Sequence, residues 1–314
     1  MNAANRTLDL ASNATSARAT PSAAANVLAL LESLRPQQWT KNLVIFTGIA
    51  FVGLLFDPGR LVKVAMAFGL FCLVSSAVYL FNDLIDVEKD RAHPEKRHRP
   101  LAAGRVRPGV AAGTSAALGG GGLIAGWALA PAFGLVLTSY VGLQLAYSLW
   151  LKHFVVLDVM TIAAGFVLRA ISGAVVIAVP VSPWLYVCAL LLALFLALGK
   201  RRHELVLLRE DAANHRPILD HYPLAFVDQL LMVVTTAALL AYMLYTFSAE
   251  NLPANHAMML TIPLPVYGMF RYLYLIYARG DGGAPDAILL RDRPLLATVA
   301  LWGVVSILIL YIWR

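Results

Sequence analysis

The stretch YLFNDLIDVEKDRAHPEKRHRPLAAG, residues 79–104, directly follows a long apolar segment and turns from acidic to basic halfway along. On a helix that turns by about 100° per residue, Asp83, Asp86 and Asp90 lie within an arc of about 60°. Three acids on one face repel each other unless a cation lies between them. Oxygen ligands of this kind suit Mg²⁺, which binds carboxylates together with substrate phosphates. The predicted metal ligands are Asn82, Asp83, Asp86 and Asp90.

The alternative for this stretch is a solvated acidic helix end without a ligand. Two features favour the metal site. The register holds over two turns while Glu88 points to the far side, and the phosphate-binding residue types Lys96, Arg97 and Arg99 follow at once. Tyr79 lies on or beside the acidic arc.

The composition predicts an all-α protein embedded in a membrane. Of 314 residues, 60% are hydrophobic and 14% are charged, and the mean hydropathy is +0.71. Apolar segments long enough to cross a bilayer recur about nine times. The predicted spans are Leu43–Leu55, Val62–Phe81, Val110–Ala130, Phe133–Trp150, Phe154–Val179, Trp184–Gly199, Leu224–Ser248, Met258–Ala278 and Leu295–Trp313.

The distribution of basic residues predicts the orientation. With a cytoplasmic N-terminus and nine spans, five of the 25 Lys and Arg residues fall outside the cytoplasmic segments, namely Arg60, Lys63, Arg169, Arg271 and Arg314. The remaining 20 are cytoplasmic, as the positive-inside rule requires. The net charge of +7 is therefore a topology signal, and no nucleic-acid partner is expected. Residues 1–25 lack periodicity and predict a disordered cytoplasmic tail, ahead of a single transmembrane catalytic domain over residues 26–314.

Further polar residues are expected on the same cytoplasmic face. The loop LGKRRHELVLLRED, residues 198–211, lets Lys200 and Glu204 pair across one helical turn. Taken alone, its basic residues are equally well explained as topology determinants. The other members of this face are Lys41, Lys152, Asp158, Arg201 and Arg202.

Two arginines lie within predicted spans. A lone arginine at mid-depth costs about 2.5–3.5 kcal/mol on insertion scales, so Arg169 is expected to face the bundle interior with a partner. A structural ion pair and a role in substrate binding both remain open for Arg169 and for Arg271.

These residues predict a cytoplasmic cavity with metal-binding acids on one wall and cations on the others. Such a cavity suits a phosphorylated substrate with a pyrophosphate leaving group, because the metal and the cations neutralise the phosphate oxygens.

The motif NDLIDVEKD resembles the first aspartate-rich motif, N-D-x-x-D-x-x-x-D, of the UbiA-type intramembrane prenyltransferases. Within that superfamily the chain is most similar to the decaprenyl-phosphate phosphoribosyltransferase branch. The resemblance covers all predicted spans and includes LRPQQWTKN, LDVMTIAAGFVLRAISG and LALGKRRHEL. Typical members carry a second motif, D-x-x-x-D, after span 6. Here that position reads GKRRHEL, which leaves Glu204 as its only acid.

The resemblance implies a UbiA-like bundle in the inner (plasma) membrane and a Mg²⁺-dependent transfer. The donor would be 5-phosphoribosyl-1-pyrophosphate and the acceptor a polyprenyl (decaprenyl) phosphate; the product would be a precursor of an arabinose donor for cell-envelope glycans. Asp83, Asp86 and Asp90 would serve the catalytic metal, and Asp158 would position a cation or a ribose hydroxyl. The substrate-binding candidates are Lys41, Tyr79, Lys96, Arg97, Arg99, Lys152, Lys200, Arg201, Arg202 and Glu204.

Three other functions compete with this hypothesis. A conventional prenyltransferase acting on an aromatic or glycerol-type acceptor would need the missing second acidic motif. A transporter or channel for a phosphorylated lipid or anion has no need of three acids in one register. In a scaffold protein, every polar cluster would serve only to determine the membrane topology. The sequence leaves the oligomeric state open, a homo-oligomer included.

Overall fold

The structure, a computed structural model, describes residues 23–94, 96–208, 218, 221–250, 252–280 and 285–313, and these segments contain helices and no strand. The tail predicted for residues 1–25 lies almost entirely outside the described residues. The α-helices are α2 (Ala23–Ser33), α3 (Phe46–Phe51), α4 (Pro58–Ile85), α5 (Val87–Ala92), α6 (Pro108–Leu129), α7 (Pro131–Leu149), α8 (Leu157–Val176), α9 (Pro183–Leu208), α10 (Leu224–Ser248), α11 (Pro263–Ala278), α12 (Pro285–Arg291) and α13 (Arg293–Ile312). The 3₁₀ helices are η1 (Pro36–Ile45), η2 (Lys96–His98), η3 (Leu151–His153) and η5 (Ala257–Thr261).

The long helices begin where the sequence provides start signals. Proline is the first residue of α4, α6, α7, α9 and α11, a position that needs no backbone N–H donor. Two starts also have an aspartate cap. Asp57 accepts a hydrogen bond from the N–H of Arg60 at 3.1 Å, and Asp292 accepts one from Leu295 at 2.9 Å.

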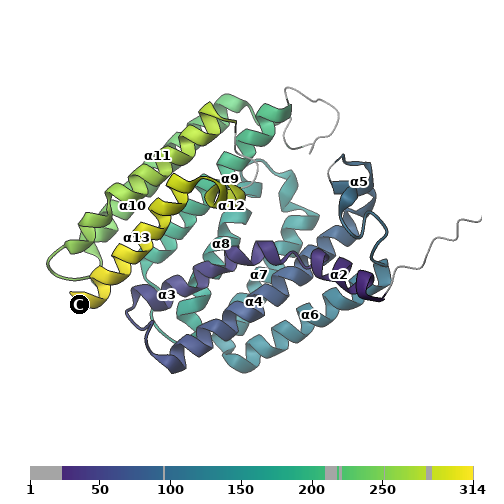
Figure 1. Ribbon diagram of the computed structural model, residues 1–314, viewed down its shortest axis with the longest axis horizontal. Coiled ribbons are helices and arrows are strands. Elements are labelled where there is room, and N and C mark those ends of the chain that lie inside the picture. Colours follow the sequence, from purple (N-terminus) through teal and green to yellow (C-terminus); the bar gives the residue numbers. More distant parts are fainter. Residues whose placement is uncertain are drawn as a thin grey trace, which may run out of the picture.

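The helices form a bundle with two packed halves (Figure 1). In one half α4 packs against α6 and α7, and in the other α10, α11 and α13 lie together, with α8 and α9 between them. Phe71, Phe133 and Leu137 are buried in the first half, and Phe195 and Leu231 in the second. The protein is therefore a polytopic helical membrane bundle, as the composition predicted.

Seven of the described helices are long and apolar enough to cross a membrane. They are Pro58–Ile85, Pro131–Leu149, Leu157–Val176, Pro183–Val206, Leu224–Ser248, Ala257–Ala278 and Arg293–Ile312. The other two predicted spans differ from these seven. The segment 43–55 is divided between η1, the six-residue α3 and a turn at Gly53, which has a φ of 77°. α6 has 22 residues but contains four consecutive glycines, Gly119–Gly122, which lower its hydropathy. The count of nine spans and the orientation of the N-terminus stay predictions.

The interrupted segment around η1 and α3 packs closely on α8. A Cβ atom at Gly173 would lie 1.8 Å from the carbonyl oxygen of Ile45, and one at Gly48 would lie 2.8 Å from the backbone nitrogen of Ala174. Only glycine allows this approach. It brings the segment that carries Lys41 and Asn42 against the centre of the bundle.

This contact gives a stability prediction. Gly173→Ala forces a methyl group into the backbone of η1, so we expect a loss of at least about 1–3 kcal/mol of stability. The measurement is the thermal unfolding midpoint of the purified protein in detergent. Gly142→Ala, on an exposed face of α7 where a Cβ meets no atom within 4 Å, is the control and should leave the midpoint unchanged or higher. Equal midpoints for the two variants would contradict the packing.

Candidate active site

The acidic stretch lies where α4 passes into α5. Asp86 lies between the two helices with φ −94° and ψ 10°, and backbone hydrogen bonds bridge the break. The N–H of Asp86 donates to Asn82 at 3.0 Å, and the N–H of Asp90 donates to Asp86 at 2.8 Å. The helix is therefore bent but its register continues. Asp83 and Asp90 are each 3% exposed, whereas the side chain of Glu88 is 78% exposed, as predicted.

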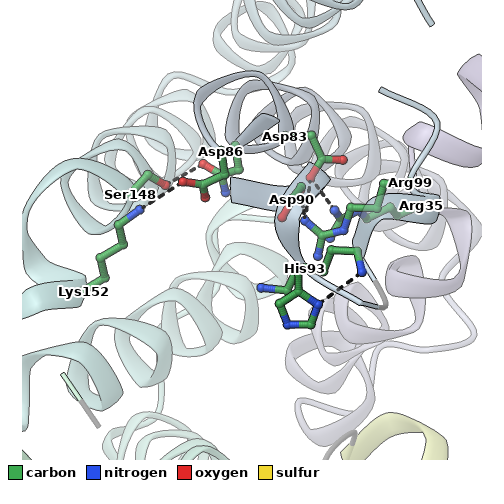
Figure 2. A network of polar contacts seen from close by, with 10 residues as sticks. Arg35, Asp83, Asp86, Asp90, His93, Arg99, Ser148 and Lys152 are labelled. Carbon is green, nitrogen blue, oxygen red and sulfur yellow. Dashed lines mark hydrogen bonds and ion pairs between the residues drawn. The ribbon is translucent and has the colours of Figure 1, made fainter. Parts of the chain in front are cut away.

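Two arginines neutralise the buried acids (Figure 2). Nη1 of Arg99 lies 2.6 Å from Oδ2 of Asp90 and 3.2 Å from Oδ1 of Asp83. Nη2 of Arg35 lies 2.5 Å from the same oxygen of Asp83, and its guanidinium lies over the ring of Tyr79 at 5.3 Å. Buried carboxylates need such partners because removing them from water is costly.

The third acid faces a different set of partners. Lys152, in η3, places its Nζ 3.7 Å from Oδ1 of Asp86, and Oγ of Ser148 donates to Oδ1 of Asn82 at 2.6 Å. Figure 2 shows the two groups on opposite sides of the helix end, Lys152 and Ser148 on one and Arg35 and Arg99 on the other. The acidic helix end thus has two cationic sides.

The donor set matches the ligands of a hard divalent cation in chemistry, since it offers carboxylate and amide oxygens. Among the described residues, however, no three His, Cys, Asp or Glu side chains lie close enough together to hold a metal ion. Asp83 and Asp90 share Arg99, whereas Asp86 contacts Lys152 on the other side of the helix end.

The other candidates near this helix end are placed as follows. Lys41 donates to Oε1 of Gln38, one turn earlier in η1. Lys96 is half-buried, and its backbone N–H donates to Nδ1 of His93 at 3.3 Å. Arg97 is exposed, with its Nε 3.3 Å from Nε2 of His98. Lys96 and Arg97 belong to η2, beside the buried acids.

Two candidates of the second loop, Arg201 and Glu204, form a cluster with Asp158 at the start of α8. Arg201 is 3% exposed, and its Nη2 lies 2.8 Å from Oδ2 of Asp158, which is completely buried. Arg201 also pairs with Glu204. The sequence had predicted Lys200 as the partner of Glu204. Two acids therefore pair with this buried arginine, so Arg201 belongs to an internal ion-pair cluster.

Tyr222 completes this cluster. Its hydroxyl donates to Oδ1 of Asp158 at 2.6 Å and accepts the N–H of Val156 at 2.6 Å. Burial and the hydrogen bond to Asp158 raise the pKa of Tyr222, so the phenol stays protonated as a donor. Val156 has a φ of 70°, a strained value for a β-branched residue. The hydroxyl thus fixes the turn between η3 and α8.

Lys200 and Arg202 point elsewhere on α9. Lys200 is exposed. Arg202 donates to Oδ1 of Asp228 at 2.7 Å and lies over the ring of Tyr277 at 3.7 Å, so it joins α9 to α10 and α11. Arg201 and Arg202, adjacent in sequence, therefore belong to separate networks.

The two arginines within spans also differ from each other. Arg271 forms a two-pronged ion pair with Asp292, at 3.1 and 2.8 Å. Arg169 is 5% exposed and has neutral partners: it donates to Oδ1 of Asn42 at 2.8 Å and to the hydroxyl of Tyr140 at 2.6 Å. The ion-pair interpretation thus holds for Arg271, while no salt bridge of Arg169 occurs in the described part of the chain.

Sequence reasoning missed three residues of these networks. Arg35 stands in the quoted motif LRPQQWTKN, and Ser148 stands one turn before Lys152, so both had a local signal. Tyr222 had none, because its partner Asp158 is 64 residues away along the chain. Arg35 and Arg99 also line a pocket of about 380 Å³ next to Asp83.

Comparison with known proteins gives the same fold and family. Residues 43–291 match the model of the UbiA prenyltransferase family. A decaprenyl-phosphate phosphoribosyltransferase of Mycolicibacterium smegmatis is 36% identical over 88% of this chain and 90% of its own length. The protein of the same name from Corynebacterium glutamicum is 34% identical over 90% of this chain and 87% of its own length.

A solved structure shares the arrangement of helices. The structure of a UbiA homologue from Archaeoglobus fulgidus bound to GPP and Mg²⁺ superimposes with a TM-score of 0.67, covering 90% of this chain and 99% of that chain at 20% identity. At that identity the similarity shows the fold.

The cluster at α8 gives a second stability prediction. Tyr222→Phe leaves the N–H of Val156 and the carboxylate of Asp158 without their shared partner, so we expect a loss of about 1–3 kcal/mol. The thermal midpoint in detergent measures it. Tyr267→Phe, on an exposed ring of α11, is the control and should keep the wild-type midpoint. A wild-type midpoint for Tyr222→Phe would show that the hydroxyl does not fix this turn.

Proposed function

The chain belongs to the UbiA prenyltransferase family, and we propose that it transfers 5-phosphoribose from 5-phosphoribosyl-1-pyrophosphate to a polyprenyl phosphate, with release of pyrophosphate. The observation that carries the proposal is the similarity to decaprenyl-phosphate phosphoribosyltransferases over nearly the whole of both chains. The site supports it, since one acidic helix end lies between two cationic sides, and the reaction joins two phosphorylated substrates.

The acidic helix end is the proposed metal site. Asn82, Asp83, Asp86 and Asp90 would hold Mg²⁺, which when bound neutralises charge on the departing pyrophosphate. The ligand oxygens come from two turns of one bent helix, so Arg35 and Arg99 have to release their carboxylates. The fold relative bound to GPP and Mg²⁺ supports a divalent metal in this family.

The proposed reaction does not depend on a strong base from the protein. Pyrophosphate leaves from C1 of the ribose while an oxygen of the lipid phosphate attacks the opposite face, which inverts C1. The attacking oxygen is already anionic at neutral pH, so no strong general base is required. The residues then act by holding both phosphates in place and by stabilising charge.

The cations divide between the two substrates. Lys96, Arg97 and Arg99, with Lys41 and Tyr79, are proposed for the phosphates of the donor. Lys152 and Lys200 are proposed for the phosphate of the lipid acceptor. Arg201, Arg202 and Glu204 support that region through their ion pairs, and Asp158 positions Arg201.

The setting is an integral membrane protein whose site faces the cytoplasm of the inner (plasma) membrane. The cytoplasmic placement follows from the basic loops that surround the site. It suits a water-soluble donor and a lipid acceptor held in the bilayer. The product would be a precursor of an arabinose donor for cell-envelope glycans.

One assay tests the reaction. Purified protein is incubated with a polyprenyl phosphate, labelled 5-phosphoribosyl-1-pyrophosphate and Mg²⁺, and labelled lipid is measured. Labelled lipid that disappears with EDTA is the expected result. Release of pyrophosphate from an allylic prenyl pyrophosphate in place of it would favour a conventional prenyltransferase.

A pair of variants tests the metal site. Asp86→Asn removes one proposed ligand, and we expect turnover to fall at least 100-fold, in the range known for lost charge stabilisation at reacting centres. Glu88→Gln, two residues away on the exposed side, is the matched control and should retain wild-type turnover. Membrane insertion and thermal midpoint are measured for both. Full activity in the Asp86 variant would remove that residue from the site.

A further inference from the structure

A pocket of about 380 Å³ opens beside Asp83, between the end of α2, the start of η1 and η2. Its volume falls within the range of small-molecule sites. Asp83 and Arg99, both assigned above to the donor side of the site, belong to its lining, so the pocket continues that site. The lining shows what kind of ligand it fits.

Most of the residues that line the pocket carry a polar or charged side chain, among them Gln37, Gln38 and His98, and Pro36 and Pro100 are the exceptions. Two of them, Arg35 and Arg99, are guanidinium groups, which bind phosphate oxygens. These side chains suit a phosphorylated, water-soluble ligand.

Two guanidinium groups line the pocket beside Asp83. Arg35 and Arg99 both reach Asp83 there, and in this arrangement their two charges balance those of Asp83 and Asp90. A metal ion on the carboxylates would free both arginines within the same pocket. Planar guanidinium groups then match the oxygens of a phosphate.

Backbone geometry points Arg35 into this position. Arg35 has a φ of 53°, the left-handed region that a non-glycine residue avoids, and it precedes Pro36. The strained turn at Arg35 separates α2 from η1 and places the Arg35 side chain beside Asp83. Glu32 of α2, held by Arg105 at 2.7 and 2.9 Å, also lines the pocket.

Resting on the proposed function, we propose that this pocket binds the ribose 5-phosphate end of the donor through Arg35, Arg99 and His98. The pyrophosphate end lies toward the carboxylates, and the lipid phosphate is left to the Lys152 side.

The surface around Lys152 agrees with this division. Trp150 and Phe154, which flank Lys152 in the chain, are 64% and 55% exposed, and Leu149 is also exposed. In a membrane protein such side chains contact lipid. The Lys152 side is thus continuous with exposed apolar side chains, whereas the pocket on the Arg35 side is lined by two arginines and further polar residues.

Direct binding measurements test the division. Full-length protein in nanodiscs with Mg²⁺ is titrated calorimetrically with ribose 5-phosphate, with pyrophosphate and with farnesyl phosphate. For Arg35→Gln we expect the Kd of ribose 5-phosphate to rise about tenfold or more, because a charge-assisted hydrogen bond is lost. The Kd values of pyrophosphate and farnesyl phosphate should change less than threefold.

The controls keep the outcomes separable. Arg60→Gln, an Arg-to-Gln change at the opposite end of α4, should leave all three Kd values at wild type. If Arg35→Gln does not fold, His98→Ala, at an exposed pocket residue, should still raise the Kd of ribose 5-phosphate. Unchanged ribose 5-phosphate binding in the folded variant, or a selective loss of farnesyl phosphate binding, overturns the proposal. A wild-type protein that binds ribose 5-phosphate but forms no labelled lipid would instead refute the proposed function alone.

Discussion

The architecture around the site depends on the need to neutralise two carboxylates buried at the end of a membrane helix. Asp83 and Asp90 are almost completely removed from water, where an unpaired negative charge is too costly to keep. Arg35 from the N-terminal segment and Arg99 from the loop after η2 meet that need. Together with the apolar cluster of Ala29, Leu80 and Leu101, the acids therefore hold together three parts of the chain.

A buried charge is also neutralised at the start of α8, where the central group is a cation and its partners are acids. There one buried arginine, Arg201, lies between Asp158 and Glu204 from two helices. Where typical family members carry a second aspartate motif, this chain has a cation that is already balanced. A fixed internal ion pair needs no metal to stay in place. The described residues thus contain two buried charge clusters, one at the end of α4 with two acids and two arginines and one at the start of α8 with two acids and one arginine.

Much of the fold was readable from the sequence, because long apolar segments with proline at their starts leave few alternatives. The helical membrane bundle is confirmed, and the exclusion of Glu88 from the acidic face followed correctly from helical periodicity. The segment 43–55 was harder, because its buried Gly48 serves close packing on α8 and Gly53 turns the chain, so the segment is not a continuous span. The acids were visible as a motif, whereas the pairing of Asp83 with Arg35, 48 residues earlier, depends on tertiary contacts that no local pattern encodes. For the same reason adjacent residues such as Arg201 and Arg202 could not be assigned to separate networks.

Arg169 connects three parts of the bundle through one buried guanidinium. Its Cα lies about 18 Å along α8 from the first residue of that helix. The guanidinium donates to the amide oxygen of Asn42 in η1 and to the hydroxyl of Tyr140 in α7, so neutral groups hold a charge that has no acid beside it in the described residues. The loss of either acceptor would leave a buried cation short of a hydrogen bond.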